Sequence, residues 1–263
     1  MEKGIVSFES VDIGELVNCF KKYGISRTFV NSERADFDEV MTIFAENGII
    51  CENLHAPFDK INDMWYGDEK TGGEMLDRLL RAVDRCAENN IPTLVVHLSS
   101  GTPMPEISEP GTKRFEKLFD YVKERDVVIA LENQRSLKNL GFFLKRYPTT
   151  GFCWDTGHEN CFTDGIRFME NFGNRLVTLH IHDNRCIYNS DDHILPFDGN
   201  IDFDYVARKI AESGYEGTLM LEVNSKTKVD GEEFYDNLKL DEYICRAVEA
   251  LNRLDKMVDG YKR

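Results

Sequence analysis

The sequence contains no apolar run that approaches the roughly 18–20 residues needed to span a bilayer. It also begins without the charged, apolar and small-residue regions of a secretory signal, because residues 1–4 lead directly into the strand-like segment 5–8. We therefore expect neither a signal peptide nor a membrane anchor, and no membrane partner.

Positive charge is scarce. The 263 residues include 32 Lys and Arg against 47 Asp and Glu, which gives a formal net charge of −15 with histidine neutral. Because nucleic-acid affinity comes largely from Lys and Arg that displace counterions from phosphates, this balance argues against an extended nucleic-acid surface and leaves only a small local patch open. With 41% hydrophobic residues, the chain is predicted to fold rather than to be disordered.

The seven cysteines form no CxxC pair, and their number is odd. Most of them lie in apolar stretches, which is typical of free thiols in a reducing compartment, so we expect a cytoplasmic protein. Cys153 and Cys186 lie near the motifs described below, but for both of them we prefer a buried structural thiol to a catalytic one.

Short apolar strand candidates alternate with longer amphipathic stretches along the whole chain, which is the pattern of repeated βα units. The eight predicted strands cover residues 4–8, 27–31, 49–55, 93–97, 127–132, 150–155, 176–182 and 218–222. The eight predicted helices cover residues 13–23, 37–47, 73–89, 113–125, 137–147, 165–171, 203–213 and 238–258.

No linker or low-complexity tract interrupts this alternation, so a single domain over residues 1–263 is predicted. Eight strand and helix pairs fit one closed parallel (β/α)8 TIM barrel, which is the α/β fold class that we predict. The alternative is an open doubly wound sheet, but such a sheet usually has a glycine-rich phosphate turn after its first strand. Residues 8–14 contain no GxGxxG motif, which favours the barrel.

Six consecutive strand candidates each carry a metal-ligand residue at or near the C-terminal end: His55, His97, Glu132, Asp155, His180 and Glu222. In a barrel these ends converge on the face where active sites of this fold lie. The chain has only six histidines, and each lies at such a strand end or in the following loop. Taken alone, each residue fits a hydrogen-bonding or capping role equally well. Together they predict a divalent-metal site, since imidazole favours zinc and carboxylates admit manganese or magnesium.

Seven short motifs around these residues follow one another in chain order: Leu54-His55-Ala56-Pro57, Val95-Val96-His97, Leu131-Glu132-Asn133, Trp154-Asp155-Thr156-Gly157-His158, Leu179-His180-Ile181-His182-Asp183-Asn184, Asp191-Asp192-His193 to Gly199-Asn200-Ile201-Asp202-Phe203, and Leu221-Glu222. The ordered series resembles the successive signatures of the xylose isomerase-like barrel superfamily. That superfamily includes sugar and sugar-phosphate isomerases and epimerases, inosose dehydratases, and the abasic-site nucleases of the endonuclease IV class. The resemblance covers nearly the whole chain, from about residue 4 to residue 222.

The resemblance implies a metal site and a reaction. The ketose 3-epimerases of this superfamily hold one divalent metal with residues that correspond by motif to Glu132, Asp155, His180 and Glu222. His180 is chosen over His182 because it satisfies the family pattern His-x-x-(Asp/Glu). In those enzymes the two glutamates also flank the substrate, one removing a proton next to a carbonyl and the other returning it, while the metal stabilises the enediolate.

By the same correspondence, Glu132, Glu222 and His158 would be the catalytic residues, with His158 in contact with substrate oxygens. The endonuclease IV branch uses a larger ligand set for three zinc ions, and this chain has a candidate for every position. The residues that would bind a second metal or the substrate are His55, His97, His158, His182, Asp191 and His193. In sugar isomerases of the superfamily, histidines of the first two motifs bind substrate without metal.

We therefore expect a metal-dependent isomerase or epimerase of a small sugar, polyol or sugar phosphate. Zinc or manganese is the expected metal, with magnesium or cobalt as alternatives. An endonuclease IV-like multi-zinc phosphodiesterase is the second hypothesis, which the extra histidines favour and the net charge disfavours. A non-catalytic sugar-binding relative is the third, which the intact four-ligand set disfavours.

Several loop residues are candidates for contacts outside the metal site. A phosphate group or other part of the substrate would bind at Arg135, Arg185 or Lys226, which lie in loops after strands. Trp65 and Tyr66, in the loop after the third strand, would cover a sugar ring or contact a second subunit. The expected partner is thus a small sugar or sugar phosphate, and a homo-oligomer stays open.

Overall fold

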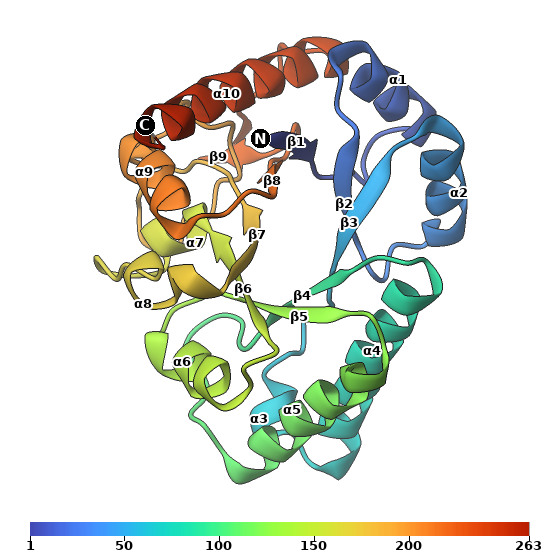
Figure 1. Cartoon of the computed structure of the whole chain (residues 1–263), viewed down its shortest axis with the longest axis vertical. Helices are drawn as coiled ribbons and strands as arrows, with labels where there is room; N and C mark the ends of the chain where they lie inside the picture. Colours follow the sequence, from blue (N-terminus) through green and yellow to red (C-terminus); the bar gives the residue numbers. More distant parts are fainter. Residues whose placement is uncertain (263) are drawn as a thin grey trace.

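Eight parallel strands form a nearly closed barrel wrapped by helices in the computed structural model, which describes residues 1–262 (Figure 1). The strands are β1 (Glu2–Ile5), β2 (Arg27–Asn31), β3 (Ile50–His55), β4 (Thr93–His97), β5 (Val128–Glu132), β6 (Gly151–Asp155), β7 (Leu176–His180) and β8 (Thr218–Leu221). Each strand from β1 to β7 pairs with its neighbour in sequence, and β1 also pairs with β8. A bridge between Ile181 and Leu221 links the remaining two edges. The predicted TIM barrel is confirmed.

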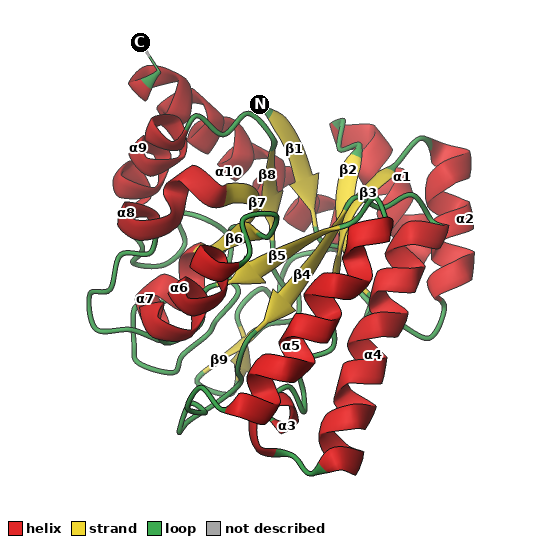
Figure 2. Cartoon of the chain, turned by 60° about the horizontal axis from the view of Figure 1, so that its bottom comes forward, coloured by secondary structure: helices red, strands yellow, loops and turns green. Residues whose placement is uncertain are grey.

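The helices lie outside the barrel, as Figure 2 shows for α4 and α5 against β4 and β5. The helices are α1 (Ile13–Tyr23), α2 (Phe37–Asn47), α3 (Asp63–Tyr66), α4 (Glu69–Glu88), α5 (Glu109–Tyr121), α6 (Leu137–Arg146), α7 (Thr156–Cys161), α8 (Met169–Phe172), α9 (Phe203–Ser213) and α10 (Leu240–Tyr261). α1 ends at Gly24, whose positive φ of 73° reverses the chain toward β2. No helix within residues 1–262 has the length and hydropathy of a membrane span.

The structure differs from the predicted elements mainly in the loops after the strands. The predicted helix at 165–171 is reduced to α8, while α7 was not predicted because it begins directly at the end of β6. Two short strands, β9 (Lys228–Val229) and β10 (Glu232–Glu233), form a hairpin after β8 that was also not predicted. The predicted buried thiol is correct for Cys153 and wrong for Cys186, which is exposed.

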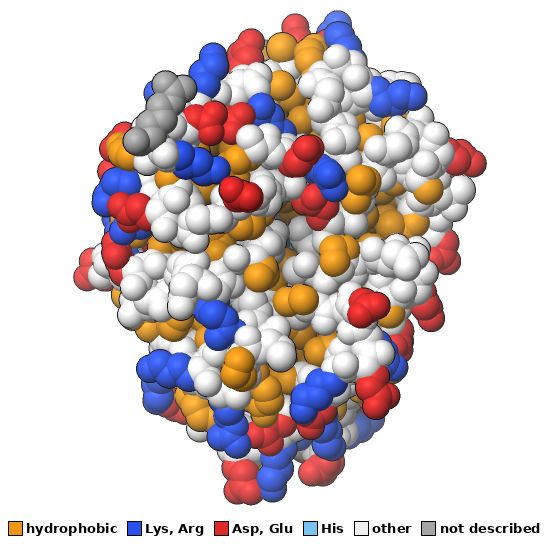
Figure 3. All heavy atoms as spheres, viewed as in Figure 1, with side chains coloured by type: hydrophobic (Ala, Val, Ile, Leu, Met, Phe, Trp, Pro, Cys, Tyr) orange, Lys and Arg blue, Asp and Glu red, His pale blue; other side chains and the backbone are white. Residues whose placement is uncertain are grey.

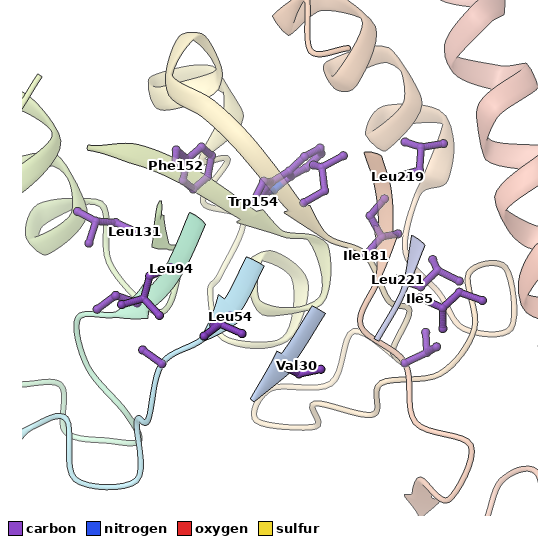
Figure 4. Close-up of a cluster of buried hydrophobic side chains, with 14 of the residues drawn as sticks. Ile5, Val30, Leu54, Leu94, Leu131, Phe152, Trp154, Ile181, Leu219 and Leu221 are labelled. Atoms are coloured by element: carbon purple, nitrogen blue, oxygen red, sulfur yellow. The ribbon is translucent and has the colours of Figure 1, made fainter. Parts of the chain in front are cut away.

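Two apolar layers hold the barrel together. The outer layer lies between the sheet and the helices, and Figure 4 shows strand residues such as Leu54, Leu131 and Phe152 in it. The inner layer is a separate small cluster of Val95, Ala130 and Cys153 inside the barrel. Small side chains suit the narrow interior. Above this layer, toward the C-terminal ends of the strands, the interior side chains become polar.

An aromatic cluster joins α3, α5 and α6 on the outside of β4 and β5. The ring of Phe143 lies 5.2 Å from Phe115 and from Phe119, and the Trp65 ring lies 5.0 Å from Phe115. Trp65 is buried, and its indole N–H donates to the carbonyl oxygen of Leu98 at 2.5 Å. The prediction that Trp65 covers a sugar ring is therefore wrong, because its side chain is part of the core.

We expect Phe143→Ala to lower the free energy of unfolding by about 3–5 kcal/mol, because it leaves a cavity in this cluster. Tyr66→Ala is the control, since Tyr66 is 66% exposed and its loss is expected to cost less than about 1 kcal/mol. Urea unfolding followed by circular dichroism measures both changes. Equal midpoints for the two variants would contradict the assignment of Phe143 to the core.

Candidate functional site

The C-terminal ends of the strands bring the predicted metal ligands together at the mouth of the barrel. Glu132, Asp155 and His180 end β5, β6 and β7, and Glu222 directly follows β8. One potential ligand atom from each lies within 4.8 Å of the other three. These four residues are called the four-ligand cluster below. All the residues predicted to hold a single metal thus meet at one point.

In the four-ligand cluster, the imidazole of His180 lies close to two carboxylates. His180 Nδ1 lies 3.2 Å from Glu222 Oε2 and 3.5 Å from Glu132 Oε2. Burial opposes protonation of His180, but the Cys153 thiol and the two carboxylates outweigh it and raise its pKa well above the ordinary value. Burial also opposes ionisation of Glu132, yet the imidazoles of His97 and His180 bring its pKa well below the usual range.

The donor atoms of this cluster are suited to a divalent cation. Asp155 Oδ2 and both ring nitrogens of His180 are buried and have no hydrogen-bond partner. Buried polar atoms normally have partners, because leaving them unpaired costs free energy. Two or more carboxylates with one imidazole form a common donor set for zinc or manganese. The residues present therefore fit a metal ion.

A second group, called the inner histidine cluster here, consists of His55, His97 and Glu132. His55 Nε2 lies 3.2 Å from His97 Nε2, which lies 3.1 Å from Glu132 Oε2. His55 Nδ1 is 2.8 Å from the Ala56 carbonyl oxygen and must carry the hydrogen, since a carbonyl only accepts. The lone pair of a neutral His55 then lies on Nε2, toward the cluster. Burial is the main cause that lowers the pKa of His97.

A third group, called the loop cluster, consists of His182, Asp191 and His193. His193 Nδ1 lies 2.8 Å from the Glu222 carbonyl oxygen, which leaves Nε2 to face Asp191 Oδ2 at 3.2 Å. Burial opposes protonation of His193, but the Asp191 carboxylate outweighs it and raises the pKa of His193 to about 10. The backbone carbonyl thus fixes the orientation of this imidazole, as is usual for metal-binding histidines.

His158 lies between the clusters. Its Nδ1 is 3.0 Å from Glu132 Oε1, and its Nε2 is 3.3 Å from Asp191 Oδ2. Burial opposes its protonation, but Asp155 and Asp191 outweigh burial and raise the pKa of His158 well above the ordinary value. His158 is therefore a cationic imidazole that contacts carboxylates of two clusters.

Asp183, which shapes the loop that carries Asp191 and His193, was not predicted as a functional residue. The buried Asp183 carboxylate accepts hydrogen bonds from four backbone N–H groups at 2.8–3.0 Å, those of Asn184, Phe197, Gly199 and Ile201. A Cβ at Gly199 would lie 2.4 Å from Asp183 Oδ1, so this approach requires glycine. In the sequence Asp183 only completed a histidine motif, whereas its contacts make it a positioning residue.

The three predicted loop cations differ in their surroundings. Arg185 pairs with Asp192 at 3.0 Å and with Asp230 at 2.9 Å, and Lys226 lies 3.4 Å from a Glu233 oxygen. The charges of Arg185 and Lys226 are therefore compensated by carboxylates at the rim of the barrel. Arg135 instead lies over the Phe162 ring, with its guanidinium carbon 3.9 Å from the ring centre.

Two adjoining cavities open at the mouth of the barrel. The larger has a volume of about 380 Å³ and the smaller about 120 Å³. Both are lined by His55, Phe58, His193 and Glu222, so members of all three clusters border the space between them. The site can therefore hold a small polar ligand directly beside the ligand clusters.

Proteins of known sequence resemble this chain over most of its length. It is 30% identical over 243 residues to the uncharacterized protein y4fM of Sinorhizobium fredii. This alignment covers 82% of this chain and 74% of y4fM. It is 24% identical over 187 residues to the uncharacterized protein MJ1311 of Methanocaldococcus jannaschii. This second alignment covers 64% of this chain and 63% of MJ1311.

Solved structures share the fold at low sequence identity. D-psicose 3-epimerase with D-tagatose from Clostridium cellulolyticum H10 superposes with a TM-score of 0.78 at 16% identity, over 98% of this chain and 99% of that one. The IOLI protein with a bound zinc atom superposes with a TM-score of 0.76 at 16% identity, over 99% of both chains. A D-tagatose 3-epimerase-like protein has a TM-score of 0.73 at 19% identity, also over 99% of both.

The family itself follows from sequence. Residues 16–253 match the family model described as xylose isomerase-like TIM barrel. This match covers the strands from β2 to β8 and all four residues of the four-ligand cluster. The chain therefore belongs to the xylose isomerase-like TIM barrel family.

Proposed function

We propose that this protein is a divalent-metal-dependent isomerase or epimerase of a small sugar, polyol or sugar phosphate. The observation that carries the proposal is the four-ligand cluster, in which the carboxylates of Glu132 and Glu222 come from strands on different sides of the mouth. Solved relatives that are 3-epimerases of ketoses, and one with a bound zinc atom, support the class of substrate and the use of a metal. The seven free thiols support a reducing, cytoplasmic location.

A divalent metal at Glu132, Asp155, His180 and Glu222 would polarise the substrate carbonyl as a Lewis acid. The chain's own residues move the protons. One of Glu132 and Glu222 takes the proton from the carbon next to the carbonyl, and the electron pair of that C–H bond moves toward the carbonyl oxygen. The other glutamate, which must carry a proton when the substrate is bound, delivers it to the opposite face of the same carbon, so that the first glutamate ends protonated and the second ionised. Two carboxylates that flank the substrate are what inversion at a carbon requires.

His158 and the aromatic side chains support this chemistry. The pKa of His158 is raised by Asp155 and Asp191 against the effect of burial, so its imidazolium can donate a hydrogen bond to a substrate oxygen at neutral pH. Phe29 and Phe58 line the larger cavity. Their rings can pack against the apolar C–H groups of a sugar and exclude water from the reacting carbon.

A second candidate function is a phosphodiesterase with several metal ions, of the endonuclease IV kind. The observation that favours it is that the inner histidine cluster and the four-ligand cluster share Glu132, while the loop cluster adjoins both. The net charge of −15 speaks against a polyanionic duplex as substrate. On the face seen in Figure 3, acidic and basic side chains are interspersed, with no continuous basic patch.

We expect the protein, loaded with Mn²⁺ or Zn²⁺ in D₂O, to exchange a carbon-bound proton of a ketose or ketose phosphate. Proton NMR of a panel that includes D-tagatose and D-fructose measures the rate. Glu132→Gln and Glu222→Gln should each lower the rate at least roughly 100-fold, because each removes one proton-transfer group. Glu249→Gln, an exposed glutamate on α10, should leave it unchanged.

Two results together would favour the second candidate function over this one. The first is incision of a DNA duplex with a single abasic site, an activity that the Glu132→Gln variant loses. The second is three equivalents of metal per chain by elemental analysis. Absence of proton exchange from the whole panel, with incision present, would contradict the isomerase and epimerase proposal directly.

We expect Asp155→Asn to weaken binding of the metal at the four-ligand cluster by more than about 100-fold, because it removes a charged ligand. Asparagine can still accept the 2.5 Å hydrogen bond from the His158 N–H that caps α7, so the fold should be retained. Asp202→Asn is the matched control, since Asp202 caps α9 in the same way outside the cluster. Full metal occupancy in the Asp155→Asn variant would refute the ligand assignment.

Metal affinity should rise as the pH is raised from 6 to 8. The pKa of His193 is raised to about 10 and that of His180 is raised in the same direction, so the metal-free site holds protons at neutral pH. A metal binds only the deprotonated ligands and must displace these protons. Release of one proton per metal makes the apparent affinity rise about tenfold per pH unit. Calorimetry in buffers of different ionisation enthalpy counts the protons, and pH-independent affinity would contradict the expectation.

A further inference from the structure

We propose that the ligand of this site is a polyol with a terminal anionic group, a phosphate or a carboxylate, and that Arg135 binds the anion. The inference rests on the proposed function for the polyol part and adds the charge of the substrate to it. The observations that carry it are the unsatisfied guanidinium of Arg135, its stacking on Phe162, and the shape and lining of the two cavities.

Arg135 is a cation whose hydrogen-bonding groups lack partners. It lies in the loop after β5, three residues beyond Glu132, and lines the smaller cavity. Its Nε and Nη1 atoms are buried and have no hydrogen-bond partner. Within residues 1–262 it forms no ion pair, in contrast to Arg185 and Lys226. Buried donors on a charged group are costly to leave unpaired, so this arrangement points to a ligand that satisfies them.

The orientation of the guanidinium suits an anion. Phe162 covers one face of the planar group at 3.9 Å, and Tyr188 lies farther away, with the guanidinium carbon 5.9 Å from its ring centre. Stacking occupies the face and leaves the N–H groups in the plane available. Those N–H groups form a rigid fork that matches two oxygens of a carboxylate or a phosphate. Arg135 is therefore held ready to bind such a group from its edge.

The larger cavity has the lining that a polyol needs. Polar side chains that line it are those of Ser7, Ser10, Asn31 and Asn224. The side-chain oxygens of Asn31 and Asn224 already accept backbone N–H groups, which leaves their NH₂ groups as donors for hydroxyl oxygens. Among residues 1–262, the lining of the two cavities contains no Lys or Arg other than Arg135. A ligand would thus place its hydroxyls in the larger cavity and its anion in the smaller one.

Glu222 and His193 line both cavities, so a ligand that extends from one to the other passes beside the four-ligand cluster. This places the reacting carbon between the polyol hydroxyls and the anion. Asp191 and Glu222 also line the smaller cavity and would repel an anion, so we place the anion beside the Arg135 guanidinium. The anion binds at the Arg135 end because no other Lys or Arg within residues 1–262 lines the two cavities.

Titration calorimetry of the metal-loaded protein with glycerol 3-phosphate, D-glycerate and glycerol tests this inference. The three probes share a three-carbon polyol and differ in the terminal group. We expect at least one anion to bind about tenfold or more tighter than glycerol. Comparison of the phosphate with the carboxylate shows which anion the site takes. Arg135→Gln should abolish the advantage, and Arg135→Lys should keep only part of it, because lysine retains the charge without the fork.

Arg146→Gln is the matched control. Arg146 also lies over a phenylalanine, 5.7 Å from the Phe142 ring centre, but it is at the far end of α6 and pairs with Glu116. This variant should bind the anions as the unaltered protein does. The inference is overturned if neither anion binds tighter than glycerol, or if the advantage survives in Arg135→Gln, as it would if the anions only bound the metal. Failure of the proposed function has a different signature, namely no proton exchange while the anion advantage remains.

Discussion

The buried carboxylate of Glu132 is the constraint on which the site depends. Four imidazoles lie within 3.5 Å of it, those of His55, His97, His158 and His180. A carboxylate without water is stable only if positive charge lies close by. In the protein alone, protons on His158 and His180, whose pKa values are raised, provide that charge. Metal ions at the same positions would provide it without protons, so the same packing explains both the raised histidine pKa values and the expected proton release.

The barrel explains why such an unfavourable arrangement can persist. Glu132, Asp155 and His180 are the last residues of three neighbouring parallel strands, so the backbone ladder fixes their spacing. Below them, Val95, Ala130 and Cys153 close the interior. The ligands from loops need separate support, and Asp183 supplies it through four backbone hydrogen bonds. Strand ligands are therefore positioned by the sheet, and loop ligands by a buried polar network.

This division also explains how far the sequence could predict the structure. The strand ranges 27–31 and 93–97 are those observed. The four-ligand cluster lies within the six ligand candidates predicted from strand ends, and the family resemblance selected these four from the six. The short helix α7 was missed because Asp155 ends a strand and caps a helix with no residue between them. The pairing of Arg185 with Asp192 and Asp230 could not be predicted, since it depends on how two distant loops fold against each other.

The unpaired state of Arg135 links the electrostatics of the site to its choice of ligand. A strongly acidic protein repels large polyanions at long range, but this effect is screened over about 8–10 Å at physiological salt. Within that distance, a stacked arginine with free N–H groups attracts one anionic group at a fixed place. Long-range repulsion with short-range attraction selects small ligands that carry one anionic group over nucleic acid. Both effects are consistent with a sugar phosphate or a sugar acid bound beside the four-ligand cluster.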